Sequence, residues 1–307
     1  MSKKSKKNRE NLPEGMSRRQ AKLAKRAAER EALARDPRPF GGLACEADLV
    51  ALQMFVPSAV ATVAVDGAER PVRIVTVLPG AGAAVVRGEG DTEEALVALQ
   101  VQSRTDNAGR DLAYALNWAR TAASGEALGS TAADGSQPQL TDLIAPDAEL
   151  DITVHDDFSW WVPEGVTPDM AVNQAIQQAN STIMPSERID ADVPGAVWWV
   201  NPGSGKAHIR WMRPEKEEDK VLTALARIAA RGELKLGEET KFAGVFRTHG
   251  LVVPVWDLDP ERATDSYGED LARVQTAIEA EYDNDARLTA DERKQLQNIK
   301  SRQVTIG

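Results

Sequence analysis

Short apolar runs bounded by turn residues follow one another along the first half of this chain. Asp-Gly and Pro-Gly pairs separate them, a pattern typical of β-strands joined by tight turns. Two helices flank the runs: a short one expected at 46–55, and an amphipathic one that Asp106 would cap and that continues to about residue 123. The predicted strands lie at 59–65, 72–78, 83–86 and 96–101.

The second half shows the same mixture after a small, polar, Gly- and Ser-rich loop at 124–139. Pro168 favours a helix start, and the spacing from Thr289 to Glu292 is that of a capping box. The pattern predicts strands at 149–154 and 158–162, hairpins of 196–200 with 207–212 and of 242–247 with 251–256, and helices at 168–180, 217–231, 266–282 and from 289 onward.

Short strands interleaved with helices indicate an α+β fold with mostly antiparallel sheets. We expect two adjoining subdomains, at 37–135 and 136–307, because the polar loop divides the elements into two sets. The sequence Gly-Arg-Asp-Leu-Ala at 109–113 resembles Gly-Glu-Asp-Leu-Ala at 268–272, and each follows an apolar strand. A duplicated strand–helix unit would explain this match, and so would common helix-start chemistry.

Residues 1–36 form a basic arm whose pattern differs from that of the body. Residues 1–15 are polar and end in Pro-Glu-Gly, so disorder is expected there. The following stretch is rich in the helix formers Ala, Lys, Arg and Glu, and Leu23 and Leu33 are its only large apolar residues. We therefore predict a helix that protrudes from the body and ends before Pro37.

Charge separates the arm from the body even more clearly. The first 35 residues carry twelve Lys and Arg against four Glu, a net charge of +8, whereas the other 272 residues carry a net charge of −18. Such an arm attracts polyanions, and RNA fits better than a membrane surface, which would need a wide apolar stripe. The alternative is an arm that only promotes solubility. The predicted nucleic-acid-binding residues are Lys3, Lys4, Lys6, Lys7, Arg18, Arg19, Lys22, Lys25, Arg26 and Arg30.

Cysteine usage and hydropathy indicate the compartment. Cys45 is the one cysteine of the 307 residues, so no internal disulfide can form and a reducing compartment is favoured. No apolar segment follows the N-terminal lysines, as a signal peptide would require. No run approaches the roughly 18 apolar residues of a membrane span. We therefore expect a cytoplasmic protein without a membrane span.

Gly-Ser-Gly-Lys at 203–206 resembles a phosphate-binding loop but does not satisfy its requirements. Val200 stands where the first glycine is needed, and Ala207 replaces the Ser or Thr that follows the lysine. The residues after it alternate as in a strand, whereas a phosphate loop leads into a helix. A hairpin turn is expected, and no cofactor is predicted.

The three histidines give little support to a metal site or an enzyme. His155, His208 and His249 have no cysteine or second histidine nearby, so no zinc spacing exists. His155 stands beside Asp156 and Asp157, which would favour a general base next to carboxylates. A polar turn after a strand is the alternative.

Six of the seven tryptophans lie in the second half of the chain, four of them as two adjacent pairs. Adjacent residues of a strand point to opposite faces, so one member of each pair could face a partner. Tryptophan is frequent at interfaces and can stack on bases. We predict Trp160, Trp161 and Trp198 as interface residues, with burial in a sheet covered on both faces as the alternative.

Three segments resemble an uncharacterised actinobacterial protein family, a domain of unknown function. They are 39–60 (PFGGLACEADLVALQMFVPSAV), 70–79 (RPVRIVTVLP) and 244–258 (GVFRTHGLVVPVWDL). Members are sometimes labelled SecA-like or topoisomerase, and the residues here support neither label. The SecA-like label comes from relatives with an N-terminal cysteine-rich zinc motif. This chain has no cysteine before Cys45, so the resemblance implies no zinc site.

These observations favour a non-catalytic accessory protein that binds RNA or a ribonucleoprotein, such as the ribosome, through its basic arm. The resemblance adds a ribosome or a secretion component as a large partner by analogy. Two alternatives remain: a protein–protein adaptor that uses the Trp-bearing second half, and an enzyme of unknown type. Affinity that falls steeply with salt would mark RNA binding, whereas an adaptor would bind one protein with little dependence on salt.

Overall fold

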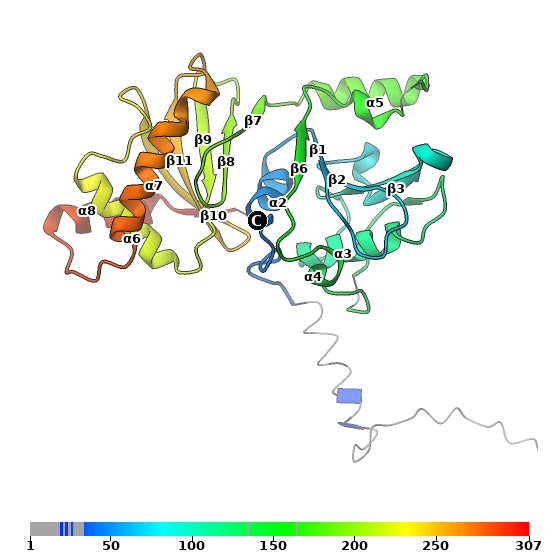
Figure 1. The fold of residues 1–307 in the computed structure, drawn as a ribbon, viewed down its shortest axis with the longest axis horizontal. Helices are drawn as coiled ribbons and strands as arrows, with labels where there is room; N and C mark the ends of the chain where they lie inside the picture. The colour runs from blue at the N-terminus through cyan, green and yellow to red at the C-terminus, as the bar shows by residue number, and fades with distance from the viewer. Residues whose placement is uncertain are drawn as a thin grey trace, which may run out of the picture.

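Two mixed β-sheets with helices packed against them lie side by side in the computed structural model of the protein (Figure 1). The structure describes residues 34–306 apart from 134 and 164, together with residues 19, 20, 22, 23 and 26 of the arm. Within this part of the chain, each sheet has six strands. The predicted α+β fold with two adjoining subdomains is confirmed.

The first sheet has the strand order β5-β3-β4-β2-β1-β6, with β2 and β4 parallel and the other neighbours antiparallel. Its strands are β1 (Ala59–Thr62), β2 (Val72–Val75), β3 (Ala84–Arg87), β4 (Glu94–Ala98), β5 (Ala127–Leu128) and β6 (Asp151–Val154). The helices of this half are α2 (Glu46–Met54), α3 (Ala108–Ala119), α4 (Leu140–Leu143) and α5 (Met170–Asn180), with 3-10 turns at Pro79–Ala81, Gly90–Thr92 and Ser159–Trp161.

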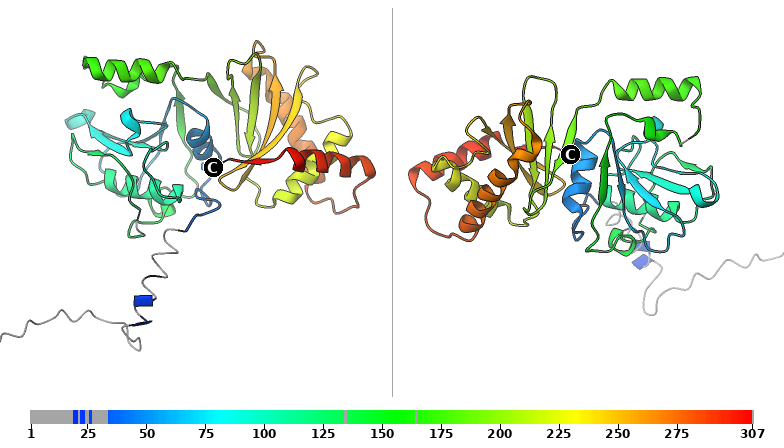
Figure 2. Two further views of the ribbon diagram at one scale, coloured as in Figure 1. Left: turned by 180° about the vertical axis from the view of Figure 1, so that it is seen from behind. Right: turned by 45° about the horizontal axis from the view of Figure 1, so that its top comes forward.

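The second sheet has the order β12-β10-β11-β9-β8-β7, and only β10 and β12 are parallel among its described pairs. Three helices cover one of its faces, as both views of Figure 2 show, and enclose a core with Trp211 and Trp256. The elements are β7 (Ser186–Ile189), β8 (Ala196–Val200), β9 (Ala207–Met212), β10 (Lys241–Thr248), β11 (Leu251–Leu258), β12 (Val304–Thr305), α6 (Glu218–Ala230), α7 (Gly268–Tyr282) and α8 (Ala290–Arg302), with a 3-10 turn at Thr264–Tyr267.

Helix α2 joins the two halves, because it lies between the sheets and contacts β8 and β9 of the second one (Figure 1). Seven of its nine residues are buried, including Glu46 and Gln53. A helix that is buried on most of its sides needs other elements packed around it. One continuous core therefore runs from the first sheet through α2 to Trp198 and Val253 of the second sheet. The two subdomains share this core.

The first sheet extends beyond the expected boundary at residue 135. β6 pairs antiparallel with β1, Ala59 opposite Val154, and it completes the edge of the first sheet. The chain thus enters the second sheet only with β7. That strand was not expected from the sequence, because Ser186–Ile189 is mostly polar and lies at a sheet edge, where little apolar pattern is required.

The predicted hairpins and the last capping box are confirmed. β8 pairs with β9 and β10 with β11, and His249 in the second turn has a positive φ of 48°, which histidine tolerates better than most residues. Thr289 Oγ1 accepts the N–H of Glu292 at 3.3 Å, while the Glu292 carboxylate accepts the N–H of Thr289 at 2.7 Å. These features depend on local sequence alone.

Three local predictions are corrected. Residues 158–162 were expected to be extended, but Ser159–Trp161 forms a 3-10 turn, with Phe158 buried beneath it. Asn107, not Asp106, caps α3 by accepting the N–H of Arg110 at 3.2 Å. Asp169, not the preceding proline, immediately precedes α5 and caps it by accepting the N–H of Val172 at 2.8 Å.

The two halves share a strand order but not every strand direction. β3-β4-β2-β1 in the first sheet corresponds to β10-β11-β9-β8 in the second. β2 and β4 are parallel, however, whereas β9 and β11 are antiparallel. The similar sequences at 109–113 and 268–272 lie at the starts of α3 and α7. Common helix-start chemistry is enough to account for them.

Candidate functional site

A cleft of about 680 Å³ lies where the arm joins the body, between the two subdomains. Its walls come from residues 35–39, from 104–108 at the start of α3, from the β10–β11 turn at 247–250, and from Thr305 and Ile306. The cleft is therefore assembled from segments far apart in the sequence. Figure 1 shows the end of the chain in the region between the two halves.

The β10–β11 turn forms one wall of this cleft and is packed against the start of the body. A Cβ added to Gly250, whose φ is 77°, would lie 2.6 Å from the carbonyl oxygen of Pro37. The His249 ring stacks on Phe40, with ring centroids 5.9 Å apart and an interplanar angle of 12°. Its Nδ1 lies 2.8 Å from the hydroxyl of Thr248. The turn that the sequence predicts is thus also a contact between subdomains.

Arginines dominate the electrostatics around His249. Burial is the main cause that lowers the pKa of His249 to about 4, and the charges of Arg104 and Arg35 contribute to this decrease. The imidazole is therefore neutral at pH 7. Within the described part of the chain, neither Arg35 nor Arg104 makes a side-chain hydrogen bond or ion pair with another residue. Both side chains are exposed and free to bind an external anion.

Carboxylates also line the cleft, but two of the three are already engaged. Glu218 pairs with Arg247 and accepts a hydrogen bond from the Gln303 amide at 2.7 Å. Asp36 accepts the backbone N–H of Arg38 at 2.8 Å. The formal charges of the wall balance, yet Arg104 and Arg35 are the charged groups of the wall that shift the pKa of His249.

Most of the predicted nucleic-acid-binding residues lie outside the described residues. These are Lys3, Lys4, Lys6, Lys7, Arg18, Lys25 and Arg30. Arg19, Lys22 and Arg26 are described, and each is helical and exposed. Arg35 and Arg104 could not be predicted as a pair, because they lie 69 positions apart in the sequence and only the fold brings them to one cleft.

The three tryptophans predicted as interface residues each donate a hydrogen bond within the molecule. Trp198 is fully buried between the subdomains, and its Nε1 donates to the Asp48 carboxylate at 3.3 Å, so it presents no surface to a partner. Trp160 and Trp161 are half-buried and donate to the Ser58 hydroxyl at 2.9 Å and the Val77 carbonyl at 3.0 Å.

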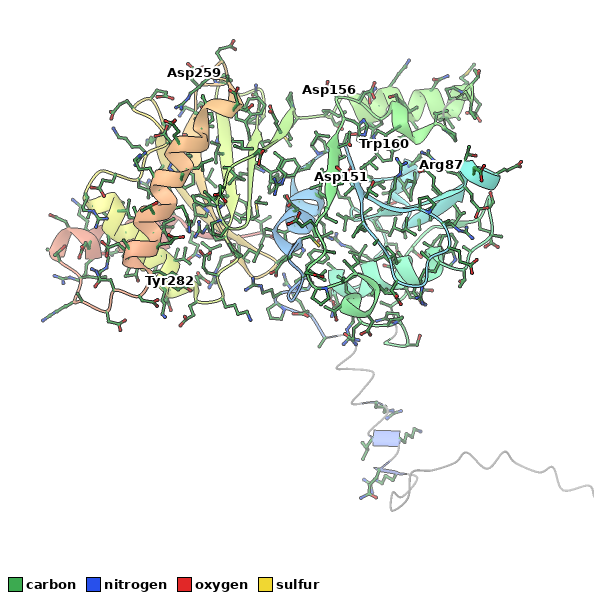
Figure 3. The ribbon with its side chains drawn as sticks, in the orientation of Figure 1. Arg87, Asp151, Asp156, Trp160, Asp259 and Tyr282 are labelled. Carbon is green, nitrogen blue, oxygen red and sulfur yellow. The ribbon has the colours of Figure 1, made fainter. Side chains whose placement is uncertain are left out.

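Arg87 holds the Trp160–Trp161 turn in place. Its Nη1 donates to both tryptophan carbonyl oxygens, at 3.0 and 2.8 Å, while Glu94 pairs with the same guanidinium at 2.8 Å. Figure 3 shows Trp160 and Arg87 below α5, at one end of the first sheet. The Trp160–Trp161 turn therefore covers this end of the first sheet, and only parts of the two indole rings reach the surface.

The Gly-Ser-Gly-Lys segment is a hairpin turn between β8 and β9. Gly203 and Gly205 have φ values of 73° and 83°, which favour glycine. The Lys206 ammonium pairs with Asp257 at 3.1 Å. A strand follows, so no helix N-terminus faces the turn, and a phosphate-binding loop is not formed.

Asp157 and Cys45 have the surroundings of a turn residue and of a buried thiol, respectively. Asp157 accepts the Ser159 N–H at 2.9 Å, and this hydrogen bond lowers its pKa, as expected for a turn. Burial raises the pKa of Cys45 to about 11, so the thiol is a poor nucleophile at pH 7. Among the described residues, no three or more His, Cys, Asp or Glu side chains form a group that could hold a metal ion.

The helices of residues 34–306 and of the described arm positions are all too short or too polar to cross a membrane.

Comparison with curated proteins found no match, and comparison with solved structures found none either. A family model does match, over residues 39–307, and its description is a family of unknown function, DUF5926. The match begins after Arg38, so the basic arm precedes it, whereas most of the cleft lies within it. Because the matched residues make up most of the chain, the protein belongs to this family of unknown function, DUF5926.

Proposed function

We propose that this protein is a non-catalytic accessory protein that binds RNA or a ribonucleoprotein, such as the ribosome, with its basic arm and the cleft at the base of that arm. The observation that carries the proposal is the position of Arg35 and Arg104. The arm leads directly into a cleft where these two arginines have no partner among the described residues and act together on a neutral His249.

Unpaired arginines stand out on this protein because its body is acidic. Several other arginines of the body are paired with carboxylates, such as Arg38 with Glu46 and Arg188 with Asp48. A phosphate would give Arg35 and Arg104 the bidentate partner that the chain does not provide. The net charge of −18 beyond residue 35 repels polyanions, so it confines their binding to the side that carries the arm.

A labelled RNA hairpin titrated with the full chain tests this proposal by fluorescence anisotropy. Replacing both Arg35 and Arg104 with Gln should weaken binding and reduce the slope of log affinity against log salt by about 2, since each arginine would neutralise one phosphate. Arg287→Gln is the matched control, since Arg287 is exposed in the α7–α8 connection and has no partner among the described residues. Equal weakening of binding in the control and the double variant would refute a role for the cleft.

The adaptor alternative has one observation in its favour, although it does not involve the predicted tryptophans. Helix α5 has no buried residue, and Met170 at its start is 86% exposed, with Val166 just before it at 55%. A protein partner could cover these side chains. Capture of one protein from a lysate that persists at high salt and is abolished in Met170→Glu would favour this function over RNA binding.

A further inference from the structure

A second, smaller cavity of about 250 Å³ lies between α2 and the second sheet. Residues of β9 alternate, so that Ile209 and Trp211 join the core under α6 and α7 while His208 and Arg210 point to the opposite side. That side faces α2, whose Met54 contributes to the cavity wall. The strand pattern thus places a half-buried arginine and a half-buried histidine in the wall of this cavity.

Arg210 brings a positive charge into this cavity without a counter-charge. Its guanidinium lies over the Phe55 ring, 4.8 Å from the centroid, and no described residue makes a hydrogen bond or ion pair with it. Burial lowers the pKa of Arg210, and no carboxylate offsets this effect, but an arginine stays protonated. An unpaired charge held partly out of water is costly unless an anion binds it.

The neighbouring polar groups do not provide a counter-charge for Arg210. Asp257 pairs with Lys206 at 3.1 Å and lies 3.2 Å from Nδ1 of His208 without the alignment of a hydrogen bond. Burial is the main cause that lowers the pKa of His208, so its ring is neutral at pH 7. No described carboxylate therefore offsets the charge of Arg210, and Asp257 in the same wall disfavours a dianion such as phosphate more than a monoanion.

The rest of the wall is apolar and includes Met54, Phe55, Phe246, Val255 and Ile306. A cavity of about 150 Å³ holds a benzene molecule, so about 250 Å³ fits a ring or short chain that carries one acid group. We propose that this cavity binds a small monocarboxylate of about ten non-hydrogen atoms in all, most of them apolar, with Arg210 holding the carboxylate by its two parallel N–H groups.

Phenylacetate is a suitable probe, and phenylacetamide is its uncharged counterpart of nearly the same shape. In calorimetric titrations of the full chain, phenylacetate should bind with a dissociation constant of about 1 mM or tighter, a level that a ligand of this size can reach. Phenylacetamide should bind at least about tenfold more weakly, because it cannot pair with the arginine charge. This comparison needs no variant, so it does not depend on the folding of a mutant.

Two further measurements locate the site. With the methionine methyl groups labelled with carbon-13, the NMR signal of Met54 should shift on addition of phenylacetate while that of exposed Met170 stays unchanged. Arg210→Met should abolish the preference for the carboxylate, whereas Arg287→Met should leave it intact. Equal affinity for the two probes, no binding of phenylacetate, or a preference retained in Arg210→Met would each overturn the proposal.

Discussion

Replacing Trp198 with alanine tests whether the two subdomains share one core. Trp198 lies on β8, fully buried, in the hydrophobic cluster that includes α2 and strands of both sheets. Its Nε1 donates to Asp48 of α2 at 3.3 Å, and Arg188 of β7 pairs with the same carboxylate at 2.9 Å. The substitution therefore removes a large ring from the interior and one of the hydrogen bonds between the second sheet and α2.

The size of the effect follows from burial. Truncating a buried tryptophan to alanine costs about 3–5 kcal/mol of unfolding free energy, since the surroundings fill the cavity only in part. Removing the hydrogen bond to a charged group adds about 1 kcal/mol, because Asp48 keeps its ion pair with Arg188. For a chain of this size, the melting temperature should fall by about 6–15 °C.

Differential scanning calorimetry distinguishes a shared core from two separate ones. We expect Trp198→Ala to unfold in a single transition at the lower temperature, because the same cluster stabilises both sheets. Trp256→Ala is the matched control: Trp256 is equally buried but lies in the cluster under α6, α7 and α8. If Trp198→Ala splits the transition and leaves one part at the original temperature, or costs less than about 1 kcal/mol, the reasoning fails.

Three further predictions follow from the site and its surroundings. Lys206→Ala should change the unfolding free energy in urea by about 0.5 kcal/mol or less, because its ion pair with Asp257 is exposed; a large decrease would contradict the hairpin description. Removing residues 1–33 should leave the melting temperature nearly unchanged, and a drop of many degrees would place the arm in the core. The pKa of His249 is about 4 in the folded protein, against an ordinary value of 6.5. As the pH falls from 6.5 towards 4, the imidazole is therefore protonated in the unfolded chain but not in the folded one, and the folded protein loses stability. His249→Asn, which tolerates the positive φ, should reduce that decrease between pH 7 and 4.5 by about 1–3 kcal/mol in urea titrations; an identical pH dependence in both proteins would count against the burial of the imidazole.

The elements with strong local signals could be predicted from the sequence. The hairpins formed by β8–β9 and β10–β11 have alternating apolar residues and turn residues between them, and Thr289 has its capping partner three positions away. The elements that were not predicted correctly have a weak or ambiguous hydrophobic pattern. β7 is polar because it is an edge strand, and the adjacent aromatic residues at 158–162 suit a buried 3-10 turn as well as a strand.

The candidate sites were much harder to predict than the fold. Arg35 and Arg104 reach one cleft from two separate segments, and Arg210 is exceptional only because the fold leaves it without a carboxylate. Neither property can be seen in a local sequence window, since both depend on long-range packing. The positive charge of the arm could be read directly, because net charge needs no fold.

The salt dependence of RNA binding tests the central claim most directly. Binding of the full chain to a labelled RNA hairpin should weaken linearly with log salt, with a slope of about −4 to −5 if about 4–6 phosphates are neutralised. Replacing Lys3, Lys4, Lys6 and Lys7 with Gln should flatten this slope, and replacing Arg18, Arg19, Lys22 and Arg26 as well should flatten it further. Binding that is absent in the full chain, or that keeps the same slope in both variants, would contradict the account.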